Sequence, residues 1–142
     1  MQIPLVRHPD SVALIVVEGD ELVLVSQTRP GAESRTLELP SGCLEPGETP
    51  AEAAGRELAE ECGLAAARWR ELGSFWAAPA YSTEYVHVFE ATETSPVESP
   101  HLDEDEDIEV ERVQAGQALG RISDAGSLAA LALWRARSLI GN

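Results

Sequence analysis

The sequence contains no lysine, and all 10 of its basic residues are arginines. Against these stand 25 acidic residues, so the formal net charge at pH 7 is -15. A strongly negative surface repels polyanions at long range, which makes nucleic acid a poor candidate partner. The sequence also lacks an apolar run of the ~18 residues that a membrane span needs. Residues 1–10 lack the positively charged start and apolar stretch of a signal peptide.

Cysteine is scarce too, with only Cys43 and Cys62 present. A small secreted scaffold usually carries more cysteines, in disulfide spacing, so the sequence favours a reducing, cytoplasmic compartment. The 142 residues, 44% of them hydrophobic and 25% charged, have the composition of an ordinary globular protein. We therefore expect one soluble domain spanning residues 1–142.

Apolar periodicity and turn residues divide the chain into strands and helices. The expected strands are 11–17, 21–27, 37–40, 69–77, 84–91 and 108–113. The expected helices are 49–63, 114–119 and 125–139. This order of elements predicts an α/β (α+β) fold in which a mixed sheet lies between helices.

The helix at 49–63 carries the clearest end signals. Thr49 is an N-cap candidate, Pro50 occupies the first helical position, and Glu52 completes a capping box. Gly63 is the expected C-terminal stop. The predicted apolar stripe of this helix is Ala51, Ala54, Leu58 and Cys62, and that of the last helix is Leu128, Leu131, Ala132 and Leu139.

Three glutamates share another face of the same helix. Glu57, Glu60 and Glu61 are three and four residues apart, a spacing at which like charges repel and weaken the helix. A bound hard cation would offset this repulsion, because Mg²⁺ prefers carboxylate oxygens and water and bridges to phosphates. A solvated acidic face is the alternative interpretation.

Further residues place these acids in a longer pattern. It consists of Gly42, five residues, Glu48, seven residues, Arg56-Glu57-Leu58, one residue, Glu60-Glu61, one residue and Gly63-Leu64. The pattern resembles the Nudix box, G-x5-E-x7-R-E-U-x-E-E-x-G-U with U aliphatic, at every fixed position. The resemblance implies the Nudix fold, a mixed β-sheet sandwiched between α-helices.

The resemblance also implies a metal site with two or three Mg²⁺ ions, Mn²⁺ being possible in their place. The implied ligands are Glu57, Glu60, Glu61 and the backbone carbonyl of Ser41, with Glu57 and Glu61 also counted as catalytic. Arg56 is implied to orient a glutamate of the helix, although pairing with Glu52 or Glu60 would be a purely structural role. Glu48 either ties the loop to the helix or assists at the metal.

The flanking segments resemble the ADP-ribose pyrophosphatase subgroup of this family. Q-T-R-P at 27–30 and L-E-L-P-S-G at 37–42 resemble Q-x-R-P and L-E-L-P-A-G, and Pro79 lies at the subgroup's spacing. A-Y-S-T-E at 80–84 has alanine in place of the usual glycine. E-D-E-D-I-E-V at 104–110 resembles the acidic segment that supplies the catalytic base, which implies Glu106 as base or extra metal ligand and Glu104 as the alternative. An acidic loop without a catalytic role is the competing interpretation.

Four residues are candidate substrate contacts. Arg29 suits a diphosphate, because a guanidinium matches phosphate geometry and stays charged. Glu84 is a candidate acceptor for ribose hydroxyls, and Glu38 and Glu104 complete the set. Their alternatives are a surface salt bridge for Arg29 and an exposed strand residue for Glu84. The aromatic rings of Trp76 and Tyr81 either stack on a base or belong to the core.

The expected function is metal-dependent hydrolysis of the diphosphate bond of a nucleoside diphosphate linked to another moiety. ADP-ribose is the first candidate substrate, with AMP and ribose 5-phosphate as products. Alternatives are another nucleoside diphosphate sugar, an oxidised nucleotide, or a non-catalytic nucleotide-binding regulatory module. The resemblance also implies a homodimer, although about ten residues precede the first strand where many subgroup members carry a longer segment.

Overall fold

The computed structural model describes residues 2–97 and 107–139. The strands in these ranges are β1 (Ser11–Glu18), β2 (Glu21–Arg29), β3 (Ser34–Glu38), β4 (Ser41–Cys43), β5 (Leu64–Trp76), β6 (Tyr85–Pro96) and β7 (Glu109–Gln114). The helices are α1 (Pro50–Cys62), α2 (Ala115–Arg121) and α3 (Ala125–Leu139), with one 3-10 turn at Pro30–Ala32. None of the helices in the described ranges is long and apolar enough to cross a membrane.

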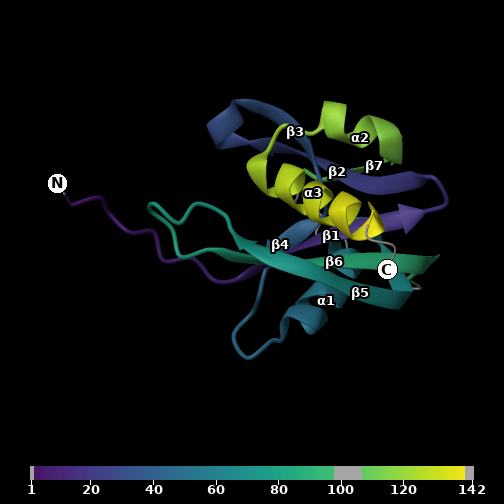
Figure 1. Ribbon diagram of the computed structural model, residues 1–142, viewed down its shortest axis with the longest axis horizontal. Coiled ribbons are helices and arrows are strands. Elements are labelled where there is room, and N and C mark those ends of the chain that lie inside the picture. Colours follow the sequence, from purple (N-terminus) through teal and green to yellow (C-terminus); the bar gives the residue numbers. More distant parts are fainter. Residues whose placement is uncertain (1, 98–106, 140–142) are drawn as a thin grey trace.

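The strands form a mixed sheet in the order β3-β2-β1-β6-β5, with β4 paired to β1 and β7 paired to β2. The central strand β1 is parallel to β6 and antiparallel to β2 and β4. Helix α1 lies on one side of the sheet, and α2 and α3 lie on the other (Figure 1). The predicted fold, a mixed sheet between helices, is therefore confirmed.

Strands β1 and β2 separate soon after the turn that joins them. Only Val17 with Leu22 and Glu18 with Glu21 are paired across this turn. Where β1 has no β2 beside it, β4 takes that place through the pairs Ser11–Cys43, Val12–Gly42 and Ala13–Ser41. The opening of the hairpin thus brings Ser41 and Gly42 to the first half of the central strand.

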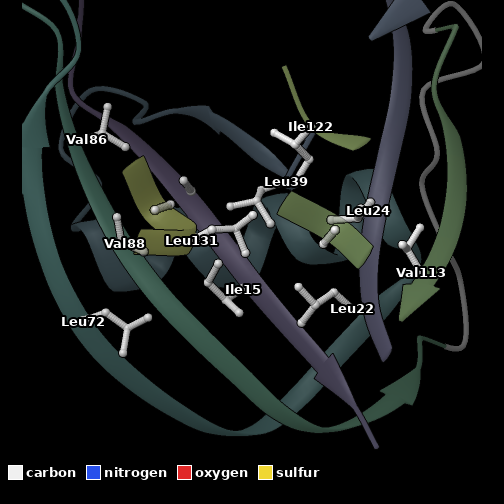
Figure 2. Close-up of a cluster of buried hydrophobic side chains, with 13 residues drawn as sticks. Ile15, Leu22, Leu24, Leu39, Leu72, Val86, Val88, Val113, Ile122 and Leu131 are labelled. Carbon is white, nitrogen blue, oxygen red and sulfur yellow. The ribbon is translucent and has the colours of Figure 1, made fainter. Parts of the chain in front are cut away.

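The alternation of β1 gives the molecule two cores. Val12, Leu14 and Val16 pack with Ala53, Ala54 and Leu58 of α1 on one side. Ala13 and Ile15 point to the other side, where they join Leu131 of α3 and other buried side chains (Figure 2). Burying an aliphatic side chain of this size stabilises the fold by about 1.5–3 kcal/mol, so β1 anchors both layers.

Helix α1 has the predicted ends. The Thr49 side chain accepts the Glu52 N–H, the Glu52 side chain accepts the Thr49 N–H, and Gly63 ends the helix with a φ of 66°. The predicted apolar stripe is correct at Ala54 and Leu58 and wrong at Ala51, which is exposed. Ala53 is buried instead, because α1 is rotated so that Glu57 and Glu61 also turn away from solvent.

Helix α3 also begins where expected, after Asp124, but its buried face differs from the prediction. Leu131 is buried, whereas Ala132 and Leu139 are exposed. Ser127 and Ala130 belong to the buried face instead. The packing of α3 against the sheet decides which side of the helix is buried.

The hairpin of β5 and β6 is longer than predicted. Residues 64–66 pair with residues 94–96 beyond the expected strand ends. This extension contains several polar side chains at 92–96, so its sequence reads as a loop although its backbone continues the ladder. A loop was expected to begin at Thr94, but residues 94–96 belong to β6. Residues 98–106 of that expected loop lie outside the described residues.

Replacing Leu14 by alanine is expected to lower the free energy of unfolding by about 3 kcal/mol, because Leu14 is fully buried and the change leaves a cavity. The matched control is Leu139→Ala, since Leu139 is 88% exposed although the sequence pattern places it in the core. Urea denaturation measures both. A loss at Leu139 equal to that at Leu14 would contradict the orientation of α3.

Candidate active site

A cleft of about 580 Å³ lies where β1, β4, α1 and the start of α3 meet. Of the residues that the sequence suggests for the site, those that line the cleft are Arg29, Glu38, Ser41, Glu57, Glu60, Glu61 and Glu84. Arg56, on α1, is not among the lining residues. Glu104 and Glu106 lie outside the described residues, and Ile108, two residues after Glu106, lines the cleft. Tertiary structure therefore brings together segments that are far apart in the sequence.

The acids of α1 are held against β4 by two close approaches. Glu57 and Glu61, 9% and 7% exposed, lie one helical turn apart on the side that faces Ser41 and Gly42. The Ser41 N–H donates to Glu61 Oε1 at 2.8 Å. A Cβ atom at Gly42 would overlap the Glu57 carboxylate. Glycine at position 42 is thus what allows the Glu57 carboxylate to reach the backbone.

Arg56 joins the loop before α1 to the acids of α1. Its Nε and Nη2 donate to Glu48 at 2.8 and 2.9 Å, and Nη2 also donates to the Cys43 carbonyl at 2.9 Å. Its Nη1 donates to Glu57 at 2.8 Å and to Glu60 at 3.1 Å. The guanidinium therefore contacts two glutamates of α1, and its bonds to Glu48 tie the loop to the helix.

The same contacts change two pKa values. The hydrogen bonds from Arg56, followed by one from the Glu45 N–H, lower the pKa of Glu48 to about 2. The hydrogen bond with Glu48 is also the main reason that the pKa of Arg56 is raised. Both groups stay ionised at neutral pH, so the network remains charged.

The donor set suits a hard divalent cation. In the described ranges no three Asp, Glu, His or Cys side chains converge closely enough to hold an ion by themselves. Mg²⁺ is usually bound through only one or two carboxylates, and water and substrate phosphates complete its shell. Glu57 and Glu61, with the backbone of Ser41 beside them, fit that pattern.

Arg29, which also lines the cleft, is held by Glu38. Its Nε and Nη2 donate to the two Glu38 carboxylate oxygens at 2.8 and 2.9 Å. Burial raises the pKa of Glu38, but the hydrogen bonds from Arg29 and Thr36 outweigh it and leave the value low. Glu38 therefore serves to orient Arg29. The alternative interpretation of Arg29 as a salt-bridge residue is correct in part, because Arg29 does form an ion pair with Glu38, and both residues line the cleft.

Glu84 is another acidic residue that lines the cleft. Its Oε2 accepts a hydrogen bond from Ser11 Oγ at 2.6 Å and lies 3.9 Å from His8 Nδ1. Trp76 and Tyr81 are 57% and 52% exposed and are absent from both the described core and the cleft lining. The alternative that placed these two rings in the core is wrong.

Sequence reasoning missed several residues that line the cleft, among them His8, Ser11, Gln27, Asp124 and Ser127. Gln27 was detectable, because it lies two residues before Arg29 in a strand and so shares its face. Asp124 directly precedes the helix expected at 125–139, so its local pattern is that of a helix cap. His8 reaches the cleft because its segment hydrogen-bonds to Thr83, a pairing for which the sequence carries no local signal.

The fold and the arrangement of α1 with its preceding loop define a NUDIX domain, and the chain belongs to this family, whose model matches residues 7–131. The chain is 40% identical over 117 residues to an ADP-ribose pyrophosphatase of Bacillus subtilis, with 81% of this chain and 63% of that protein covered. It is 36% identical over 122 residues to a methanol dehydrogenase activator of Bacillus methanolicus, with 84% and 66% covered. The chain therefore spans about two thirds of the length of these relatives.

A solved structure of an ADP compounds hydrolase superposes with a TM-score of 0.83 at 30% identity. The match covers 93% of this chain and 73% of that one. This TM-score and coverage place this chain and that hydrolase in one fold.

The stabilising effect of Glu48 is expected to depend on pH. Its folded pKa of about 2 lies below the ordinary value of about 4.3, so its contribution is present above the ordinary value. The contribution is lost as the pH falls through the folded value. The melting temperatures of the protein and of Glu48→Gln should therefore differ most near neutral pH and converge in acid. A difference that stays constant with pH, or equals that of the exposed control Glu71→Gln, would contradict this role.

Proposed function

We propose that this domain hydrolyses the diphosphate bond of a nucleoside diphosphate linked to another moiety, with ADP-ribose as substrate and AMP and ribose 5-phosphate as products. The observation that carries the proposal is the approach of Glu57 and Glu61 to Ser41 and Gly42 in a cleft that also presents Arg29. The names of the pyrophosphatase and hydrolase relatives favour the same reaction.

The charge of the cleft supports a role for metal ions. Among the described residues that line it, six are acidic and Arg29 is the one arginine. A diphosphate entering such a cleft would be repelled unless cations accompanied it. We infer two or three Mg²⁺ ions, or Mn²⁺, held by Glu57, Glu60, Glu61, the Ser41 carbonyl and Glu106. When bound, such ions neutralise the diphosphate and lower the pKa of coordinated water.

The chain's own residues would then position the reactants. Arg56 orients Glu57 and Glu60, and Arg29 binds the diphosphate or the adjoining ribose. Glu38 holds Arg29, and Glu84, with Glu104, accepts hydrogen bonds from sugar hydroxyls. Glu106 removes a proton from the attacking water. A bond forms between the water oxygen and one phosphorus, and the second phosphate leaves as the bridging P–O bond breaks.

A regulatory role is the second candidate function. It is favoured by the 36% identity to the methanol dehydrogenase activator. A non-catalytic Nudix module would be expected to lose Glu57 or Glu61, and this chain has both. Catalysis is therefore the better supported proposal.

The active-site proposal is tested by incubating the protein with ADP-ribose and a panel of nucleoside diphosphate sugars, dNTPs and oxidised nucleotides, each with Mg²⁺ or Mn²⁺. AMP release from ADP-ribose is expected. Glu57→Gln should lower kcat on the order of 100-fold, because charge stabilisation at the reacting phosphate is lost. Gly42→Ala should act similarly, since its Cβ displaces the Glu57 carboxylate.

Glu71→Gln is the control, because Glu71 is exposed and outside the cleft lining. Cleavage of another panel member, but not of ADP-ribose, would assign a different substrate and leave the proposed reaction unchanged. Absence of cleavage of any panel member with either metal would reject the enzymatic function and favour the regulatory role.

We also propose a homodimer in the cytoplasm. The N-terminal segment runs beside the β5–β6 connection, away from the rest of the molecule (Figure 1), and Val6 bridges to Ser82 there. Large apolar side chains that are half exposed or more lie in the N-terminal segment (Ile3, Leu5, Val6), at the end of β5 (Trp76) and in the β5–β6 connection (Tyr81). Such a patch is typical of a protein interface, while the net charge of -15 argues against nucleic acid as a partner.

Replacing Val6 by aspartate is expected to convert the dimer to a monomer, because a charge would be buried at the interface. Sedimentation velocity measures the change. Val110→Asp is the matched control, since Val110 is also exposed but lies on β7, away from the patch. A protein that sediments as a monomer before any substitution would reject the dimer.

A further inference from the structure

Asp124 has a carboxylate oxygen that the capping of α3 does not use. Its Oδ2 accepts the Ser127 N–H at 3.0 Å, which is an N-cap contact. Its Oδ1 is buried and accepts no hydrogen bond from the described residues. A buried acceptor without a partner is unfavourable, and serine or asparagine would cap the helix as well. Capping therefore does not explain why a charge stands here.

The charge of Asp124 acts on the end of the cleft that Arg29 occupies. The cleft and a neighbouring depression of about 400 Å³ share three lining residues, namely Arg29, Glu38 and Asp124. These residues therefore lie between the cleft and the depression. The hydrogen bond with Glu38 is the main cause of the raised pKa of Arg29, and the nearby charges of Glu61 and Asp124 add to it. Glu38 already binds Arg29 through both oxygens. The negative charge of Asp124 is therefore in excess of what is needed to neutralise Arg29.

The other cleft carboxylates have defined roles or partners. Glu57, Glu60 and Glu61 are the proposed metal ligands, and Arg56 bonds to two of them. Glu84 accepts a hydrogen bond from Ser11. Asp124 and Glu84 are thus the acidic residues of the described lining whose charge neither an arginine pair nor the proposed metal site accounts for, and Asp124 differs from Glu84 in having a buried oxygen that accepts no hydrogen bond from the described residues.

We propose that Asp124 is a specificity-determining residue that selects against nucleoside triphosphates and for diphosphates whose far end is uncharged, such as a sugar. The proposal rests on the proposed function. A terminal phosphate adds negative charge that the excess carboxylate repels, whereas a sugar adds none. At an effective dielectric constant of about 20 and a separation of about 10 Å, one such charge changes an affinity about tenfold.

The test compares Asp124→Asn with Glu52→Gln. Each change removes one negative charge from a helix-capping side chain, and each amide still caps. Glu52 is exposed and outside the cleft lining, so its variant controls for net charge and for the cap. Calorimetry measures the Kd of α,β-methylene analogues of ATP and ADP-ribose, in which carbon replaces the bridging oxygen and blocks hydrolysis.

In Asp124→Asn, the Kd of the ATP analogue relative to that of the ADP-ribose analogue should fall about tenfold, and less at high salt. In Glu52→Gln the ratio should stay within about twofold of the parent value. Asp124→Ser, which also caps α3, replaces Asp124→Asn if that variant melts early. An unchanged ratio in a folded Asp124 variant, or no binding of either analogue by the parent protein, would overturn the proposal.

This outcome is separable from that of the proposed function. If the parent protein cleaves ADP-ribose but the ratio does not change, only the role of Asp124 is rejected. If the ratio changes as expected but no diphosphate is cleaved, the catalytic proposal fails and the selection against triphosphates remains a property of the cleft.

Discussion

The site depends on the guanidinium of Arg56. It is the cation that bonds to Glu48 in the loop before α1 and to Glu57 and Glu60 on α1, and it also binds the Cys43 carbonyl. Without it, Glu57 and Glu60 would lose the cation that they share, and Glu48 would lose the bonds that tie the loop to α1. A planar group with five N–H donors can make all of these bonds at once, which a lysine ammonium cannot.

The geometry of the sheet places the backbone of β4 beside this network of hydrogen bonds. Because β1 and β2 separate after their turn, the short strand β4 can lie beside the first half of β1. The backbone at Ser41 and Gly42 is thereby held against the inner face of α1. A helix packed on a continuous hairpin would bury apolar residues on that face instead, and the acids would have no polar backbone to contact.

Excess negative charge is the second feature of the cleft. The acids near α1 and those near Arg29 point into the same space, so a phosphate group meets repulsion on both sides unless cations are bound. Such a site would bind an anionic ligand only together with cations that neutralise its charge. Binding would then depend on the cation supply and on how much charge the ligand carries, which links the choice of substrate to the same physical constraint as catalysis.

The sequence alone determined α1, because its capping box, its Gly63 stop and its glutamate spacing are local properties of one helix. It also indicated, through short motifs, Arg29 and the glutamates of the described cleft lining. Only the tertiary structure decided that Asp124 and His8 join them and that Ala51, Ala132 and Leu139 face solvent. The reason is physical: burial and convergence depend on strand pairings between residues far apart in the chain, and periodicity within one segment cannot specify its partners.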